Sequence, residues 1–303
     1  MLSSMFQESP FLSRLLLSAA VTVGVFGLFE LGLGFCGGEW SELYEGSPHT
    51  YWELRPNLDL NEVPHREEGT TFSVRTNDRG LRDGPMPSDS PWVLALGCST
   101  TFGWGVEGAE AWPEVLERSL GVDVVNAGVP GHSSHQGLEI APRLLKLRPR
   151  VAIFAWGLRD GNLVGRPDAA SRAPQFPRNT RIFGWLKDML PKPEREVGGV
   201  PRVGSASFGD NLRTLASMAV AQDTRVVLLD MTTTRSHANV LDEVGLPVVR
   251  PRLGSGHRFE SDPVHFTVAG NAVIAAQIEG TVRAALSEEE PPRSVPPAPP
   301  QTP

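Results

Sequence analysis

The fold is decided by Trp92-Val-Leu-Ala-Leu-Gly97-Cys98-Ser99-Thr100-Thr101-Phe102-Gly103, an unbroken apolar run that ends in a turn of small residues. A short apolar run closed by glycine is typical of a buried strand in a parallel sheet. In open α/β sheets, ligands bind just beyond the carboxyl ends of such strands. Ser99 lies at that edge and is the first candidate for chemistry. Capping a helix or forming a turn is the alternative role of an isolated serine.

Downstream of this run, short apolar segments alternate with amphipathic ones. Further strands are expected at residues 122–125, 151–156, 225–230 and 247–250. Helices are expected at residues 110–120, 133–147, 208–221 and 268–286. This alternation predicts an α/β fold, a three-layer α/β/α sandwich around a parallel sheet with right-handed crossovers.

The amino-terminal segment differs from this core because it is almost purely apolar. Residues 15–29 carry no charge, and accepting Glu30 extends the apolar stretch to Cys36. This length matches the ~20 residues of a membrane-spanning helix. A cleaved signal peptide is the alternative, but no small-x-small cleavage site follows. Phe35, directly before Cys36, does not fit a lipoprotein site.

The charges that flank residues 15–36 predict the orientation of this anchor. Arg14 precedes it, whereas Glu39, Glu42 and Glu45 follow it. The positive-inside rule therefore leaves residues 1–14 in the cytoplasm. For a bacterial chain, this predicts a single-pass inner-membrane protein whose body lies in the periplasm.

The main domain is expected at residues 92–286, and the other segments are interpreted relative to it. Residues 37–91 are polar and largely irregular and are expected to form a membrane-proximal extension that packs on this domain. Within them, the alternation from Phe72 predicts a short strand that ends in a turn at residues 77–80. Residues 158–204 hold too many prolines and glycines for regular packing and are expected to form a lid-like insertion. Within it, residues 182–190 form a predicted apolar stripe: Ile182, Phe183, Trp185, Leu186 and Met189. This stripe is expected to close over an acyl chain, to touch the membrane surface or to pack on the domain. The proline-rich residues 287–303 are expected to be disordered.

Composition narrows the class of function. Apolar and charged fractions of 40% and 21% are those of a folded globular chain. A net charge of −7 without a basic run argues against nucleic acid as a partner.

Four loops that follow predicted strands, or precede the last helix, carry polar or glycine-rich sequence. They contain Ser99, residues 126–132, residues 157–162 and residues 262–265. The rule for open α/β sheets places all four loops at one edge of the sheet.

These loops contain the parts that a serine nucleophile requires. Such a serine needs a base, a group that orients the base, and donors for the oxyanion. His265 is the candidate base and Asp262, three residues before it, is the candidate orienting group. Backbone N–H groups of Ser99 and Gly131 are candidate oxyanion donors.

The same loops resemble a known family. Gly97-Cys98-Ser99, Asn126 to Gly131, Gly157 to Asp160 and Asp262-x-x-His265 are similar, in order and spacing, to the four blocks of the SGNH, or GDSL-type, hydrolases. The resemblance covers roughly residues 92–286. It implies a flavodoxin-like SGNH fold and an ester hydrolase with Ser99 as nucleophile, Gly131 as oxyanion donor, His265 as base and Asp262 as its partner.

Two further segments resemble the membrane-anchored bacterial branch of that family. They are Arg75-Thr-Asn77-Asp-Arg-Gly80-Leu-Arg82 and Phe208-x-x-Asn211-Leu212. This likeness implies architecture more than substrate.

The chain departs from the family pattern at two positions. Cys98 replaces the aspartate before the nucleophile, and a cysteine nucleophile is the alternative at this turn. Arg159 replaces the asparagine that supplies a side-chain oxyanion donor, and losing one such donor typically costs ~10²–10³ in rate. Three outcomes stay open: Arg159 donates to the oxyanion, Asn162 substitutes, or the site is impaired and Arg159 pairs with Asp160 or another acid.

Two classes of function follow. The first is a serine esterase acting on acyl esters, O-acetyl groups included, of a small molecule or of cell-envelope or extracellular carbohydrate or lipid; an O-acyltransferase using the same serine is its variant. The second is a catalytically impaired module that binds a glycan or a partner. No cofactor is expected. No metal is expected either, because His132 and His135 have no carboxylate or cysteine at metal spacing and are interpreted as polar surface residues.

Overall fold

The computed structural model describes residues 10–35, 42–82, 84–88, 91–171, 182 and 199–289. The chain forms two compact units, residues 1–43 with 174–193 and residues 44–173 with 194–303. The expected stripe at residues 182–190, apart from Ile182, lies outside the described residues, as does the tail beyond residue 289.

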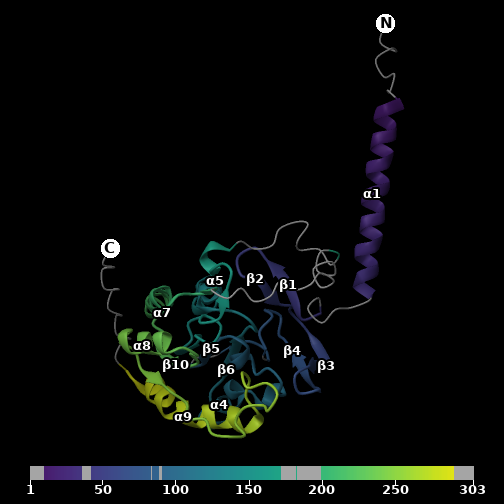
Figure 1. Cartoon of the computed structure of the whole chain (residues 1–303). Coiled ribbons are helices and arrows are strands. Elements are labelled where there is room, and N and C mark those ends of the chain that lie inside the picture. Colours follow the sequence, from purple (N-terminus) through teal and green to yellow (C-terminus); the bar gives the residue numbers. More distant parts are fainter. Residues whose placement is uncertain are drawn as a thin grey trace, which may run out of the picture. The chain divides into compact units, whose positions relative to one another are not determined.

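The described part of the first unit is mainly helix α1 (Pro10–Phe35), drawn in purple in Figure 1. Its segment Ser13–Gly32 has a mean hydropathy of 1.9 and is long and apolar enough to cross a membrane. A signal sequence near an amino terminus has the same length and composition. The helix agrees with the expected span and leaves both interpretations available.

The second unit is built on a five-stranded parallel sheet with the strand order β11-β10-β7-β5-β6. The strands are β5 (Val93–Gly97), β6 (Val124–Gly128), β7 (Val151–Ala155), β10 (Arg225–Leu229) and β11 (Val248–Val249). All residues of the four longer strands are buried. Gly97 pairs with Gly128 and Ala155, so the carboxyl ends of the three central strands meet at one edge.

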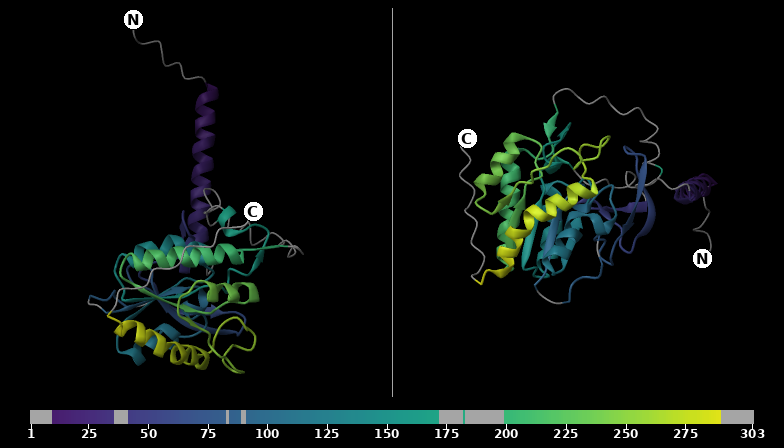
Figure 2. Two further views of the ribbon diagram at one scale, coloured as in Figure 1. Left: turned by 90° about the vertical axis from the view of Figure 1, so that its left-hand side faces the viewer. Right: turned by 90° about the horizontal axis from the view of Figure 1, so that it is seen from below.

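Helices cover both faces of this sheet (Figure 2). Helices α4 (Trp112–Leu120) and α9 (Val268–Ser287) pack together on one face. There, Trp112 and Ile274 bury against strand residues such as Ile153. The opposite layer contains α5 (Ser134–Leu145) and α7 (Ser205–Val220), with α8 (Arg235–Glu243) packed beside α7. The predicted three-layer α/β/α sandwich is confirmed.

Helix α8 was absent from the predicted pattern. The helix is short and mostly polar, and among its residues only His237 and Leu241 are buried, so little apolar sequence marks it. The described ends of the insertion carry a short hairpin of β8 (Leu163–Val164) and β9 (Val200–Pro201), and a 3₁₀ turn, η2 (Asp168–Ala170).

The short strand expected from Phe72 is present, but the interpretation of the rest of residues 37–91 as irregular is wrong for its described part. Two antiparallel hairpins form there: β1 (Tyr44–Ser47) with β2 (Tyr51–Leu54), and β3 (Asp59–His65) with β4 (Thr70–Arg75). On the second hairpin, Val63, Phe72 and Val74 are buried while neighbouring residues are partly or fully exposed. On β3 the two buried residues are Val63 and the polar His65. Because His65 is polar, the sequence does not show the alternation of apolar and polar residues that would predict this strand.

Arg82 ties this extension to the turn that follows Ser99. Its Nη1 donates to the carbonyl oxygens of Phe102 and Gly103, each at 2.7 Å. Its Nη2 donates to Val106 at 2.7 Å and to Ser73 at 2.9 Å. The guanidinium also lies over the Phe102 ring at 4.3 Å, and burial lowers the pKa of Arg82 to about 10. Arg82 thus fixes the backbone behind the candidate nucleophile.

Replacing Arg82 by Lys is expected to lower the free energy of unfolding by about 3 kcal/mol. The planar guanidinium donates hydrogen bonds to four carbonyl oxygens, and the single ammonium of lysine cannot reach all four. Urea denaturation measures this loss. Arg75→Lys is the matched control, since Arg75 is 68% exposed and pairs only with exposed Asp59; its expected change is below about 0.5 kcal/mol. Equal losses in the two variants would contradict the role given to Arg82.

Candidate active site

Ser99 lies where strand β5 passes into a single helical turn, α3 (Ser99–Phe102). Cys98 occupies the cap position in an extended conformation, and Gly103 closes the turn with a φ of 81°. The Ser99 side chain is buried, and its Oγ lies 2.7 Å from Nε2 of His265.

His265 and Asp262 come from the loop before α9. Oδ2 of Asp262 accepts a hydrogen bond from Nδ1 of His265, and Oδ1 accepts one from the backbone N–H of Val264 at 3.2 Å. The structure therefore brings Ser99, His265 and Asp262 into one hydrogen-bonded chain. All three side chains are buried.

A second histidine, His65 of strand β3, contacts the same carboxylate. Its Nε2 lies 2.9 Å from Oδ2 of Asp262, and the His65 side chain has no exposed surface. Its Nδ1 has no hydrogen-bond partner among the described residues, so Nε2 carries the proton and donates. The ring packs edge-on against Phe259, with centroids 4.6 Å apart. Sequence reasoning missed His65 because it lies far from the family motifs.

Gly105 makes room for this histidine. It has a φ of 88°, and a Cβ at this position would lie 2.6 Å from Nδ1 of His65. Any other residue would displace the ring from Asp262.

The two histidines determine the charge state of Asp262. Burial alone would raise the pKa of this carboxyl, but the hydrogen bonds from His265 and His65 hold it well below its usual range. Asp262 is therefore ionised at neutral pH and able to orient His265.

His65, Asp262 and His265 also form a set of metal-ligating types, with ligand atoms within 4.8 Å of one another. Both ring nitrogens that face Asp262 act as hydrogen-bond donors here. A cation would therefore have to displace two protons or turn both rings. The expectation that the protein uses no metal remains a prediction.

The loop that contains Gly131 is fixed by contacts with Trp52 and Arg202. Gly131 has a φ of 86°, and a Cβ there would lie 2.9 Å from the Trp52 ring of the extension. Its carbonyl accepts a 2.7 Å hydrogen bond from Arg202, which also forms a 2.8 Å ion pair with Asp168. Its backbone N–H has no acceptor among the described residues. This geometry leaves a fixed and available donor.

In the loop of residues 157–162, Asp160, Arg159 and Asn162 lie in different environments. Asp160 is buried and accepts hydrogen bonds from the backbone N–H groups of Ser134 and Gly157, both at 3.0 Å. Arg159 forms no ion pair with Asp160, and its Nε is buried without a partner among the described residues. Asn162 is exposed. Of the alternatives for Arg159, pairing with Asp160 is wrong.

The interpretation of His132 as a surface residue is also wrong. Its side chain is buried, and its Nε2 lies 2.8 Å from the carbonyl oxygen of Trp52. Burial lowers the pKa of His132 to about 4, so the ring is neutral and donates this bond. His132 thus helps to fasten the extension to the Gly131 loop.

With this geometry in view, the family can be assigned. The model of the GDSL-like lipase/acylhydrolase family matches residues 95–273, and the chain belongs to this family. Family membership supports ester hydrolysis as the general activity.

Solved structures similar to the chain include three bacterial proteins. A lipase/acylhydrolase from Enterococcus faecalis is 18% identical, with 66% of this chain and 100% of that chain covered and a TM-score of 0.47. The psychrotrophic esterase EstA from Pseudoalteromonas sp. is 13% identical, with coverages of 66% and 100% and a TM-score of 0.45. A carbohydrate acetylesterase family member from Sinorhizobium meliloti is 16% identical, with coverages of 66% and 100% and a TM-score of 0.40. A comparison with curated proteins finds no match.

The charge of Asp262 predicts a specific pH dependence. Because the pKa of Asp262 is lower in the folded than in the unfolded protein, its ionised form stabilises the fold at pH values above the unfolded-state carboxyl pKa of about 3.9. This contribution is lost as the pH falls toward the folded-state pKa. Between about pH 5 and pH 3, wild-type protein should therefore lose more free energy of unfolding than Asp262→Asn. Urea denaturation of both proteins at each pH measures the two slopes. Parallel slopes would show that Asp262 is not the group concerned.

Proposed function

We propose that the protein is a membrane-anchored serine esterase in which Ser99 is the nucleophile, His265 the base and Asp262 the residue that orients the base. The observation that carries this proposal is the 2.7 Å contact between Ser99 Oγ and His265 Nε2, continued through Nδ1 to the ionised Asp262. This sequence of donor and acceptor atoms is the one that serine acyl transfer requires.

The reaction proceeds in two halves. His265 Nε2 takes the proton from Ser99 Oγ as the oxygen attacks the ester carbonyl. The tetrahedral intermediate collapses, the C–O bond to the alcohol breaks, and the alcohol leaves with the proton from His265. Water then loses a proton to His265 and attacks the acyl-enzyme, and the carboxylic acid departs as Ser99 regains its proton.

The developing oxyanion requires donors. The backbone N–H groups of Ser99 and Gly131 supply two, since the first lies at the start of α3 and the second has no competing acceptor among the described residues. Arg159 supplies the third in place of the usual asparagine. This role is supported by its half-buried side chain and by its Nε, which has no partner in the part of the chain that the structure describes. The exposed Asn162 is the alternative third donor.

The substrate and location follow from the anchor. Helix α1 holds the enzyme in the inner membrane as a single-pass protein with its catalytic domain on the periplasmic side. There, acyl or O-acetyl esters of cell-envelope or extracellular carbohydrate or lipid are within reach. If a sugar hydroxyl replaces water in the second half, the same serine performs O-acyl transfer.

Arg159 also favours a second candidate, a binding module without catalysis. A guanidinium recognises carboxylates and phosphates well and differs from the asparagine donor in shape and charge. Covalent reactivity of Ser99 separates the two candidates.

Ser99→Ala and His265→Ala are expected to abolish labelling by a fluorophosphonate probe and to lower hydrolysis of p-nitrophenyl acetate by at least ~10³-fold, because nucleophile or base is lost. Cys98→Ala is the matched control and retains both activities, since Cys98 is buried with its Sγ 3.3 Å from Thr100 Oγ1. Labelling of the Ser99→Ala protein at the wild-type rate would overturn the assignment. No labelling of wild type would favour the binding module.

Arg159→Ala is expected to lower kcat by ~10²-fold, because one oxyanion donor is removed. Arg159→Asn restores a neutral donor of the family type and should recover part of the loss. Steady-state kinetics with p-nitrophenyl acetate measures both variants. Unchanged kcat in Arg159→Ala would assign the third donor elsewhere, with Asn162→Ala as the next variant.

His65 is proposed as a positioning residue that acts through Asp262. His65→Leu removes one buried hydrogen bond and should lower kcat about 10-fold with little change in KM. His65→Gln can place an amide N–H near the former Nε2 position and should recover most of the rate, which a merely space-filling role does not predict. Equal kcat values for the two variants, with both proteins folded, would rule out this role.

A further inference from the structure

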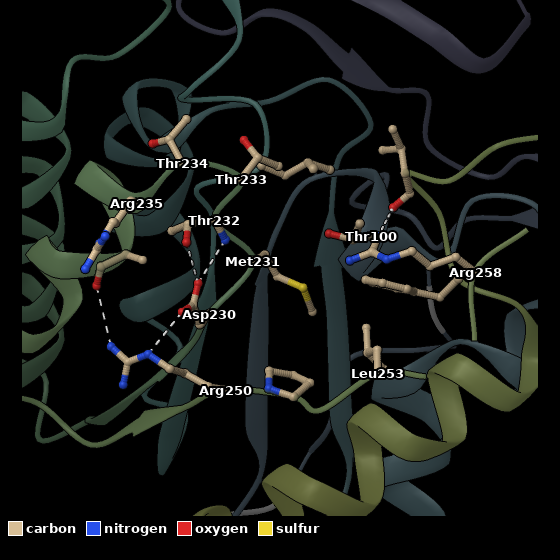
Figure 3. Close-up of a pocket in the computed structure, with 15 residues that line it drawn as sticks. Thr100, Asp230, Met231, Thr232, Thr233, Thr234, Arg235, Arg250, Leu253 and Arg258 are labelled. Carbon is tan, nitrogen blue, oxygen red and sulfur yellow. Dashed lines mark hydrogen bonds and ion pairs between the residues drawn. The ribbon is translucent and has the colours of Figure 1, made fainter. Parts of the chain in front are cut away.

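A pocket of about 380 Å³ is lined by residues next in sequence to Ser99 and His265 (Figure 3). Thr100, which follows Ser99, and Val264, which precedes His265, both line it. This volume lies in the range of about 300–1,000 Å³ that is typical of small-molecule sites. The pocket is therefore placed to hold the part of a substrate next to the ester bond.

The walls of this pocket combine hydroxyl groups with a small apolar surface. The hydroxyl groups belong to Thr100, Thr232, Thr233 and Thr234. Those of Thr100, Thr232 and Thr234 also form hydrogen bonds within the protein, with Cys98, Asp230 and His237. The apolar side chains are those of Leu158, Met231, Leu253 and Phe266, among others. Several hydroxyl groups suit a hydroxylated ligand such as a sugar better than a long acyl chain, which requires a mainly apolar channel.

The ionisable side chains of the pocket are three arginines and one aspartate. Figure 3 shows Arg235 and Arg250 on one side and Arg258 on the other. Arg250 is neutralised, because its Nε lies 3.2 Å from Asp230 and its Nη2 lies 2.8 Å from Asp242. The other oxygen of Asp230 accepts hydrogen bonds from the backbone N–H and the hydroxyl group of Thr232.

Within the described part of the chain, Arg235 and Arg258 are the pocket cations without an ion pair, although the ionised Asp262 lies near enough to Arg258 to act on its charge. Neither forms an ion pair with any residue that the structure describes. Arg258 is held in place because its Nη1 donates to the carbonyls of Pro263 and Val264, at 3.1 and 2.9 Å, and its guanidinium stacks over Phe266 at 4.6 Å. Its Nε and Nη2 then remain for a ligand. Guanidinium groups without an ion pair suit an anionic ligand.

We propose that this pocket binds a carboxylate or phosphate on the alcohol part of the substrate, and so selects esters of acidic sugars over neutral ones. This specificity rests on the proposed function, because it concerns the ester that Ser99 attacks. A guanidinium binds either anion through two parallel N–H donors, and the exposed Thr233 hydroxyl is placed to bind a hydroxyl group of the sugar ring.

The test compares three esters on the full-length protein: acetylated methyl glucoside, acetylated methyl glucuronoside and acetylated glucose 6-phosphate. At least one anionic ester should have a kcat/KM about 10-fold or more above that of the neutral ester, and which one it is separates carboxylate from phosphate recognition. Raising the salt concentration should reduce this ratio. Arg235→Gln and Arg258→Gln should each lower the ratio several-fold. Arg252→Gln, which alters an exposed arginine outside the pocket lining, should leave the ratio unchanged.

Equal kcat/KM values for the three esters, or a ratio unaffected by both pocket variants, would overturn the proposal. A direct binding measurement distinguishes failure of the pocket proposal from failure of the esterase assignment. Methyl glucuronoside and glucose 6-phosphate are titrated into Ser99→Ala protein and its Arg258→Gln derivative by NMR. Binding of either ligand that weakens several-fold in the derivative supports the pocket even without catalysis. If neither ligand binds and the three esters are turned over equally, the proposal of an anion-selective pocket is rejected while the esterase assignment stands.

Discussion

The buried negative charge of Asp262 is the constraint on which the site depends. A carboxylate removed from water is unfavourable unless donors replace its hydration. Here the N–H groups of His265, His65 and Val264 supply them. Each donor comes from a backbone that must itself be fixed, so the loop before α9 and the β3–β4 hairpin are both required to stabilise one ion.

The extension before the sheet is therefore part of the site and not merely a spacer. His65 contacts Asp262, Arg82 binds the carbonyls behind Ser99, and Trp52 packs on Gly131. All three residues precede residue 95, where the match to the family begins. The contacts of residues 44–82 thus come from outside the part of the chain that matches the family.

Sequence reasoning reached the sheet, its crossovers and the meeting of Ser99 with His265, because buried parallel strands are continuous apolar runs and their carboxyl ends share one edge. It did not reach His65 or His132. Their burial depends on hydrogen bonds to Asp262 and to the Trp52 carbonyl, which are tertiary contacts without a local pattern. Helix α8 was missed for the related reason that only two of its residues are buried.

The central claim, that Ser99 is acylated through His265, is tested most directly by trapping the intermediate. Full-length protein is mixed with p-nitrophenyl acetate, quenched in acid within the first turnovers, digested and mapped by mass spectrometry. A single acetyl group on the peptide that contains Ser99, absent from the His265→Ala protein, is the predicted result. Turnover with no acetylated peptide, or acetyl on Cys98, would contradict it.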